Sequence, residues 1–318
     1  MKPTLSVLLG LLLLAGCQSG LNKSERGPVS SDAPIRVVAT TSMIADLVRV
    51  IGQPYVSVEG LMGPNVDPHL YKASEGDVRL MSAADVVIYS GLHLEGKMVD
   101  IFEQMESRNL EVHALAASFA PSDLLESSYF AGNHDPHFWF DVSLWGKAAS
   151  TVAAILATFD PLHATQYAEN LNRYEALLQT TDAEIRTLVN QIPQEMRVLV
   201  TSHDAFGYFG RAYGVEVKGL QGLSTATEAG TADVQELAAF VAERKIPAIF
   251  IESSISPRGI EAVREAVRAK GFDVQIGGTL YGDALGSPGS NADTYVGMVL
   301  ANAQTLVSGL ASDSNLGQ

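Results

Sequence analysis

The sequence is poor in cysteine and in positive charge, and each shortage narrows what the protein can be. Cys17 is the single cysteine among 318 residues, so no disulfide can form within the chain. Lys and Arg together number 21 against 36 Asp and Glu, which gives a net charge of −15. This acidic balance argues against nucleic acid as a partner and mildly favours a cationic ligand.

Common catalytic motifs are missing as well. The sequence contains no His-Glu-x-x-His, no Gly-x-Ser-x-Gly and no phosphate-binding glycine loop. These are the signatures of zinc proteases, serine hydrolases and P-loop enzymes. We therefore expect a binding protein rather than an enzyme.

Long apolar runs are confined to the N-terminus. Lys2 precedes an apolar run from Leu5 to Leu14 that is too short to span a bilayer, as in a secretory signal. The residues Leu14-Ala15-Gly16-Cys17 resemble a bacterial lipobox, whose cysteine is acylated and becomes the new N-terminus. We expect residues 1–17 to be a lipoprotein signal peptide and Cys17 to carry a lipid anchor on a bacterial membrane, facing the periplasm or the cell exterior. The alternative is an ordinary signal peptide that contains a cysteine.

The rest of the chain divides into a tether, two α/β regions and a helix between them. Residues 18–34 are rich in Ser, Gly, Asn and Pro and predict a flexible tether. Residues 35–159 and 194–318 each alternate short β-branched runs with amphipathic helical segments, which predicts an α/β fold with two open parallel-sheet lobes. Apolar residues at helical spacing predict a long, rigid connecting helix over 160–193. No segment after the signal resembles a membrane span.

Proteins with open parallel sheets bind small molecules and ions beyond the carboxyl ends of the strands. Four residues that could coordinate a metal follow predicted strands or precede helices. They are His69, His137, His203 and Asp283. The triplet Asp67-Pro68-His69 recurs at residues 135–137, which suggests two equivalent ligand-presenting turns. Three imidazoles and a carboxylate suit Zn²⁺ or Mn²⁺. The alternatives are surface or capping roles for the histidines, a turn role for Asp283, and His134 as a competing ligand.

These residues lie within motifs that resemble a known family. The lipobox, Asp67-Pro68-His69, the stretch 135–141, the stretch 201–209 and Tyr281-Gly282-Asp283-Ala284-Leu285 resemble the bacterial metal-binding lipoproteins of ABC importers, the TroA, ZnuA and PsaA type (cluster A-I, or class III, solute-binding proteins). The resemblance implies that His69, His137, His203 and Asp283 are the four metal ligands and that the metal lies in the cleft between the lobes. It also implies a monomer that delivers the ion to an ABC permease and ATPase.

Two features bear on the transported metal and point in different directions. Some manganese-dedicated relatives carry a glutamate where this chain has His203, and three nitrogen donors suit zinc. Many zinc-dedicated relatives carry a histidine-rich loop, whereas only His113 and His134 lie between His93 and His137 here. The sequence therefore predicts zinc, manganese or both as the cargo. Because ligand imidazoles must be neutral, we expect affinity to fall below about pH 6.5.

Three functions other than transport would use the same sequence differently. A zinc-dependent hydrolase could use the same four ligands with a bound water, and Glu252 would be its spare base, although we expect Glu252 rather to orient a ligand histidine. A surface adhesin of the same family would need attachment modules, and the sequence has no repeats or low-complexity arms. A siderophore or cobalamin binder would need a wide cleft without clustered ion ligands.

Overall fold

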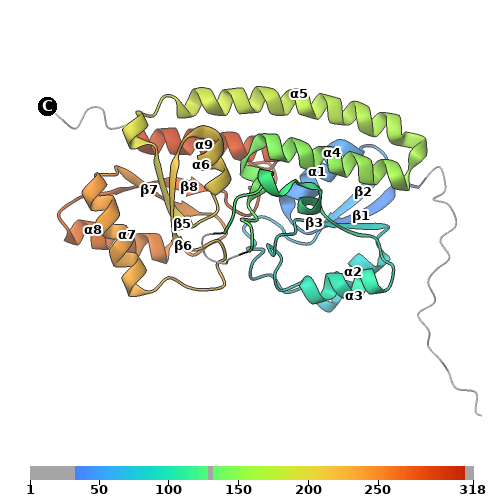
Figure 1. The fold of residues 1–318 in the computed structure, drawn as a ribbon, viewed down its shortest axis with the longest axis horizontal. Coiled ribbons are helices and arrows are strands. Elements are labelled where there is room, and N and C mark those ends of the chain that lie inside the picture. Colours follow the sequence, from blue (N-terminus) through green and yellow to red (C-terminus); the bar gives the residue numbers. More distant parts are fainter. Residues whose placement is uncertain (1–32, 128–131, 312–318) are drawn as a thin grey trace, which may run out of the picture.

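The computed structural model describes residues 33–127 and 132–311. The predicted signal peptide at 1–17, the lipidation site Cys17 and the tether as far as residue 32 lie outside the described residues. Within them, two α/β lobes lie side by side under one long helix (Figure 1). The predicted α/β fold of two parallel-sheet lobes is confirmed.

The first lobe is built on a four-stranded parallel sheet of Val- and Ile-rich strands in the order β2-β1-β3-β4. Because the strands are parallel, all their carboxyl ends meet at one edge of the sheet. The strands are β1 (Ile35–Ala39), β2 (Val56–Gly60), β3 (Val86–Tyr89) and β4 (Val112–Ala114), and the helices are α1 (Ser42–Gly52), α2 (Glu75–Ala83), α3 (Val99–Ser107) and α4 (Val142–Phe159).

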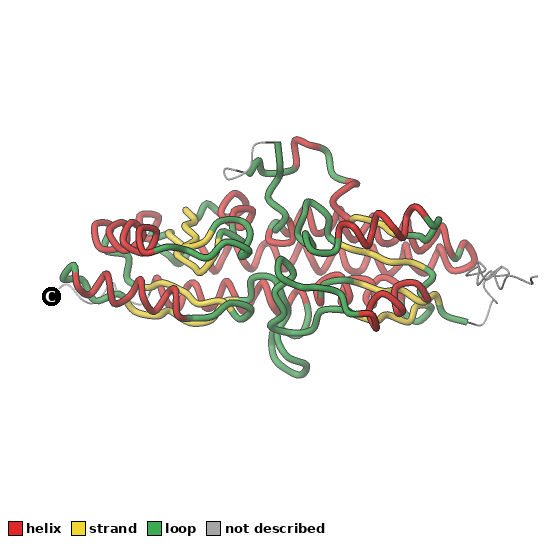
Figure 2. The backbone as a smooth tube through the Cα atoms, turned by 90° about the horizontal axis from the view of Figure 1, so that it is seen from below, coloured by secondary structure: helices red, strands yellow, loops and turns green. Residues whose placement is uncertain are grey.

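The second lobe repeats this plan with two parallel pairs, β5-β6 and β7-β8, and β5 lies against β7. Its strands are β5 (Val198–His203), β6 (Glu216–Gln221), β7 (Ala248–Glu252) and β8 (Gln275–Leu280). Its helices are α6 (Gly207–Tyr213), α7 (Thr231–Arg244), α8 (Arg258–Ala269) and α9 (Tyr295–Leu310). Seen from below, loops of both lobes gather between the two sheets (Figure 2).

Helix α5 (Ala164–Val189) has 26 residues, a length of about 39 Å at 1.5 Å per residue. It packs against α1 and α4 of the first lobe and against α6 and α9 of the second. The helix is shorter than the predicted 160–193. Before its start, Pro161–His163 forms a separate 3-10 turn. Asp160, the residue before this turn, accepts a hydrogen bond from the Tyr167 hydroxyl and pairs with the His163 ring, so it does not continue the helix.

One apolar core runs through both lobes, and it includes the buried aromatic residues Trp139, Trp145 and Tyr295. The indole of Trp145 stacks on the ring of Tyr295 with a centroid distance of 4.6 Å, so α4 of one lobe packs directly on α9 of the other. A second cluster, rich in methionine, fills the space between the first sheet and helices α2 and α3. The shared core joins the lobes on the side of α5.

By length and composition alone, α4 could cross a membrane. The prediction from the sequence was that no such segment follows the signal. Half of its apolar window is buried within the protein. Trp145, Val152 and Leu156 are fully buried and belong to the shared core. The apolar character of α4 is therefore used in packing against α1 and α5.

The loop after β3 is held in an unusual backbone conformation by a buried acid. Gly91, Leu92 and His93 all have positive φ angles, which residues other than glycine rarely adopt. Glu95 accepts hydrogen bonds from the hydroxyl of Thr40 at 2.7 Å and from two backbone N–H groups of the loop. Burial raises the pKa of Glu95. This carboxylate thus fixes the loop against the carboxyl end of β1.

Candidate metal site

The four predicted ligands are carried by different elements that converge between the lobes. His69 lies in the loop between β2 and α2, and His137 precedes the short 3-10 turn before α4. Asp283 follows β8. His203 is the last residue of β5 instead of lying in the loop beyond it, because the pairing with β6 continues as far as Gln221 opposite His203.

The side chains of these four residues meet at one point. One ligand atom from each of them lies within 4.8 Å of the others, the only such group of three or more acidic, histidine or cysteine side chains among the described residues. Nε2 of His69 is 3.3 Å from Nε2 of His137. The Asp283 carboxylate is 3.3 Å from Nε2 of His203, 3.6 Å from that of His137 and 3.7 Å from that of His69. These spacings fit nitrogen and oxygen atoms arranged around one small cation.

All four residues are buried, with exposed fractions of 4% or less. Neither carboxylate oxygen of Asp283 has a hydrogen-bond donor within the described part of the chain, and neither does Nε2 of His203. A buried carboxylate without hydrogen bonds is costly unless a positive charge compensates it. The arrangement therefore suits a bound cation.

Each of the two Asp-Pro-His turns uses its aspartate to fix the histidine backbone. Oδ1 of Asp67 accepts the N–H of His69 at 2.9 Å, and Oδ1 of Asp135 accepts the N–H of His137 at the same distance. Asp135 also lies 2.7 Å from Nδ1 of its own histidine, so Nε2 is the ring nitrogen that faces His69 and Asp283. The sequence repeat thus corresponds to one repeated local structure.

Glu252 performs the equivalent role for His203 from the carboxyl end of β7. Its Oε1 accepts the backbone N–H of His203 and the hydroxyl of Thr201, both at 2.9 Å. Its Oε2 lies 2.9 Å from Nδ1 of His203. The structure thus places Glu252 behind a ligand imidazole, where a hydrolytic base could not reach a water on the ion.

The charges of the site are unevenly distributed when no metal is bound. Burial lowers the pKa of His69 to about 3, so this ring is neutral. Burial also opposes charge on His203, but Glu252 and Asp283 outweigh it and raise the pKa of His203 well above 6.5. Burial would raise the pKa of Asp283, yet the charge on His203 holds it below its usual range. The positive charge of protonated His203 therefore offsets part of the negative charge of Glu252 and Asp283.

Two further residues shape the site and were not predicted as part of it. Nε1 of Trp139 donates to the carbonyl oxygen of Gly282 at 3.1 Å, which ties the first lobe to the residue before Asp283. A Cβ on Gly282 would overlap the Glu252 carboxylate. The aromatic cluster after His137 and the glycine before Asp283 are visible in the sequence, but their partners are not.

His134, the competing ligand, is not among the four converging residues. It forms an isolated antiparallel bridge with Glu126 in the segment that precedes His137.

Comparison with known proteins identifies the family. The model of the family ZnuA, described as zinc-uptake complex component A, periplasmic, matches residues 37–309. The zinc-binding protein TroA of Treponema pallidum is 47% identical over 304 residues, covering 96% of this chain and 97% of TroA. The manganese-binding lipoprotein MntA of Bacillus subtilis is 44% identical, covering 96% of this chain and 97% of MntA.

The fold also matches a solved structure. The structure of periplasmic zinc-binding protein TroA from Treponema pallidum superposes with a TM-score of 0.85 at 48% identity, covering 88% of this chain and all of that one. The predicted resemblance to metal-binding components of ABC importers is confirmed. The chain belongs to the family of zinc-uptake complex component A proteins, the solute-binding components of metal ABC transporters.

Proposed function

We propose that the protein binds one Zn²⁺ or Mn²⁺ ion between its lobes through His69, His137, His203 and Asp283 and delivers it to a membrane importer. The observation that carries this proposal is the convergence of three imidazole nitrogens and an Asp283 carboxylate to which no described residue donates a hydrogen bond. Imidazole and carboxylate ligands without a thiolate favour divalent zinc or manganese over copper(I).

Transport is favoured over zinc-dependent hydrolysis. All four ligands are buried, and Glu252 lies behind His203 at Nδ1 rather than beside the ion. A catalytic zinc keeps a position open for water and substrate, whereas a carrier encloses its ion. The family assignment to a transport component points the same way. Adhesion, the other alternative, has no feature of the described residues in its favour.

The cargo is zinc or manganese, and both have support. TroA is named for zinc and MntA for manganese, at 47% and 44% identity over nearly the same length. So small a difference in identity does not separate the two metals. By the Irving–Williams order, such a site binds Zn²⁺ more tightly than Mn²⁺, whichever of the two metals is transported in the cell.

The cellular setting follows from the N-terminal sequence and the family. We propose that residues 1–17 are a signal peptide, that Cys17 carries a lipid anchor, and that residues 18–34 tether a monomer outside the cytoplasm. We propose domain boundaries at 35–159, 160–193 and 194–318. They are supported by the two lobes' separate sheets, whose strands come before α5 in the first lobe and after α5 in the second. An ABC permease and ATPase are the partners of a solute-binding component.

Titration of the purified domain with Zn²⁺ and Mn²⁺ tests the metal site. We expect one equivalent to bind, and His69→Ala or His203→Ala to weaken binding at least a hundredfold because each removes an inner ligand. His113→Ala, which removes a histidine of β4 far from the cluster in the fold, is the matched control and should bind as the parent does. Parental affinity in both ligand variants would refute the assignment.

A further inference from the structure

The two Asp-Pro-His turns differ in what the aspartate contacts besides the histidine backbone. In the second turn, Asp135 contacts the ring of its own histidine through Oδ1. In the first turn, Oδ2 of Asp67 accepts a hydrogen bond of 2.6 Å from the hydroxyl of Thr225 in the other lobe. The backbone of His69 is therefore held by a carboxylate that is itself held across the cleft.

Thr225 lies in the segment 222–230, which joins β6 to α7 without regular secondary structure. Its side chain is buried, with 6% exposed, although the next three residues are all exposed. Leu223 is also buried, at 8% exposed, but Thr225 is the buried residue of the segment whose side chain bonds to the first lobe. The short distance is that of a hydrogen bond to a charged acceptor, which is stronger than one between neutral groups.

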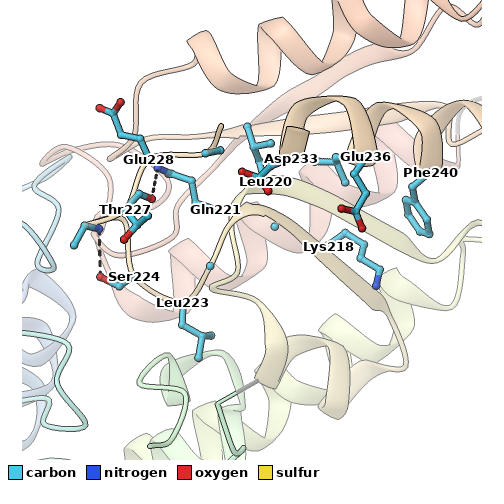
Figure 3. A pocket seen from close by; sticks show the side chains of 15 residues that line it. Lys218, Leu220, Gln221, Leu223, Ser224, Thr227, Glu228, Asp233, Glu236 and Phe240 are labelled. Carbon is cyan, nitrogen blue, oxygen red and sulfur yellow. Dashed lines mark hydrogen bonds between the residues drawn. The ribbon is translucent and has the colours of Figure 1, made fainter. Parts of the chain in front are cut away.

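The segment borders open space on its other side. A groove of about 680 Å³ is lined by residues 218–224, by residues 226–229 of the segment, and by α7 (Figure 3). None of the four ligands lines this groove, and neither does Thr225. Within the second lobe the ends of the segment are held by the buried Leu223 and by the 2.7 Å hydrogen bond from the Gly230 N–H to Asp233. Its exposed middle makes the longer, 3.3 Å hydrogen bond from the Gln221 side chain to the carbonyl oxygen of Thr227. The segment therefore has room to move away from Asp67.

The lobes themselves are joined far more firmly. Trp139 contacts Gly282 and accepts a hydrogen bond of 2.7 Å from the Tyr295 hydroxyl through its backbone carbonyl. A continuous apolar core runs across the same junction. Separating the lobes would expose this core and break several buried hydrogen bonds, whereas moving segment 222–230 breaks the hydrogen bond of Thr225.

We propose that Thr225 is a positioning residue that holds segment 222–230 against the first lobe and, through Asp67, fixes His69 for ligation. Loss of the ion begins with the breaking of the Thr225–Asp67 hydrogen bond and the movement of the segment. This inference rests on the proposed function, since it assumes that His69 binds the metal.

Rapid mixing of the Zn²⁺-loaded protein with excess chelator tests the proposal by measuring the dissociation rate. Thr225→Val keeps the shape of the side chain and removes the hydroxyl, and we expect dissociation to become about tenfold faster with little change in association. Thr225→Ser keeps a hydroxyl and should restore slow dissociation. Thr227→Val, two residues away on the exposed part of the segment, is the matched control and should behave as the parent does.

A double-mutant cycle separates this role from general loosening of the segment. In an Asp67→Ala background the acceptor is already lost, so Thr225→Val should have no further effect on dissociation. An equal effect in both backgrounds, or parental dissociation in Thr225→Val, would overturn the proposal. The Zn²⁺ affinity of His69→Ala is measured in parallel. If this variant keeps full affinity, the proposed metal site is refuted as well. If it binds weakly while Thr225→Val dissociates at the parental rate, only the positioning role is refuted.

Discussion

Glu252→Gln is the substitution that separates the roles of charge and shape at the site. The change is nearly isosteric, and it exchanges one carboxylate oxygen for an NH₂ group. If the amide oxygen takes the place of Oε1, it still accepts from Thr201 and from the backbone N–H of His203. The NH₂ group then faces Nδ1 of His203 in place of Oε2, at the position now 2.9 Å away.

This replacement selects the wrong form of the imidazole. An NH₂ group donates to Nδ1, which places the ring proton on Nε2, the atom that faces Asp283 and the ion. If the amide turns the other way, two buried donors lose their acceptor instead, at about 1–3 kcal/mol each. This second orientation costs about 2–6 kcal/mol of stability, so the first is favoured. Loss of the carboxylate behind a ligand histidine lowers metal affinity about 10- to 100-fold, or about 1.4–2.8 kcal/mol, and we expect a loss of this size in Zn²⁺ affinity at pH 8.

The pH dependence gives a second, independent result. The charge of Glu252 is the largest single cause that raises the pKa of His203, and in the parent protein a metal must therefore displace a proton even above pH 6.5. Parental affinity should therefore begin to fall above pH 6.5 as the pH is lowered, earlier than the histidine reference value suggests. Without the charge of Glu252, the pKa of His203 is lower and the affinity of the variant should stay flat to lower pH. The two curves then converge as the pH falls.

Chelator-competition titrations between about pH 6 and pH 9 measure both effects. Glu261→Gln, on the exposed surface of α8 in the same lobe, serves as the charge-matched control. Calorimetry in buffers of different ionisation enthalpy counts the protons released, and we expect about one fewer at neutral pH in Glu252→Gln. Affinity within twofold of the parent at pH 8, together with a parallel pH curve, would refute the reasoning.

Other predictions follow from the contacts around the site and the core. Gly282→Ala should weaken Zn²⁺ binding at least tenfold because its Cβ overlaps the carboxylate behind His203, while Gly63→Ala, whose Cβ meets no atom within 4 Å, should leave binding in the same titration unchanged. Trp139→Phe leaves the buried carbonyl of Gly282 without its donor, so we expect the free energy of unfolding to fall by about 1–3 kcal/mol and the unfolding temperature measured by calorimetry to fall with it. An unchanged unfolding temperature would contradict a stabilising hydrogen bond between Trp139 and Gly282. Glu95→Ala removes the acceptor of three buried donors and should cost about 2–5 kcal/mol in urea unfolding, and a loss below 1 kcal/mol would show that water replaces the carboxylate.

Much of the fold could be predicted because its signals are local. The strands β1 and β3 and the helices α2 and α4 lie where β-branched runs and helical periodicity place them. Strand ends were less certain, since they depend on a neighbour: β5 continues to His203 because β6 supplies a pairing partner there. The start of α5 likewise depends on how Asp160 bonds to Tyr167.

The sequence by itself determined which residue types could bind a metal and that their loops follow strands. The repeated Asp-Pro-His triplet, His203 and Asp283 were all recognisable, because ligand chemistry and local turns are properties of short segments. Only the tertiary structure decided that these four side chains share one buried point, since they come from segments up to 214 residues apart in the sequence. The structure also distinguished the two turns: the sequence makes them alike, but Asp67 reaches Thr225 across the cleft while Asp135 holds its own histidine. Packing between lobes sets such contacts, and no local pattern encodes them.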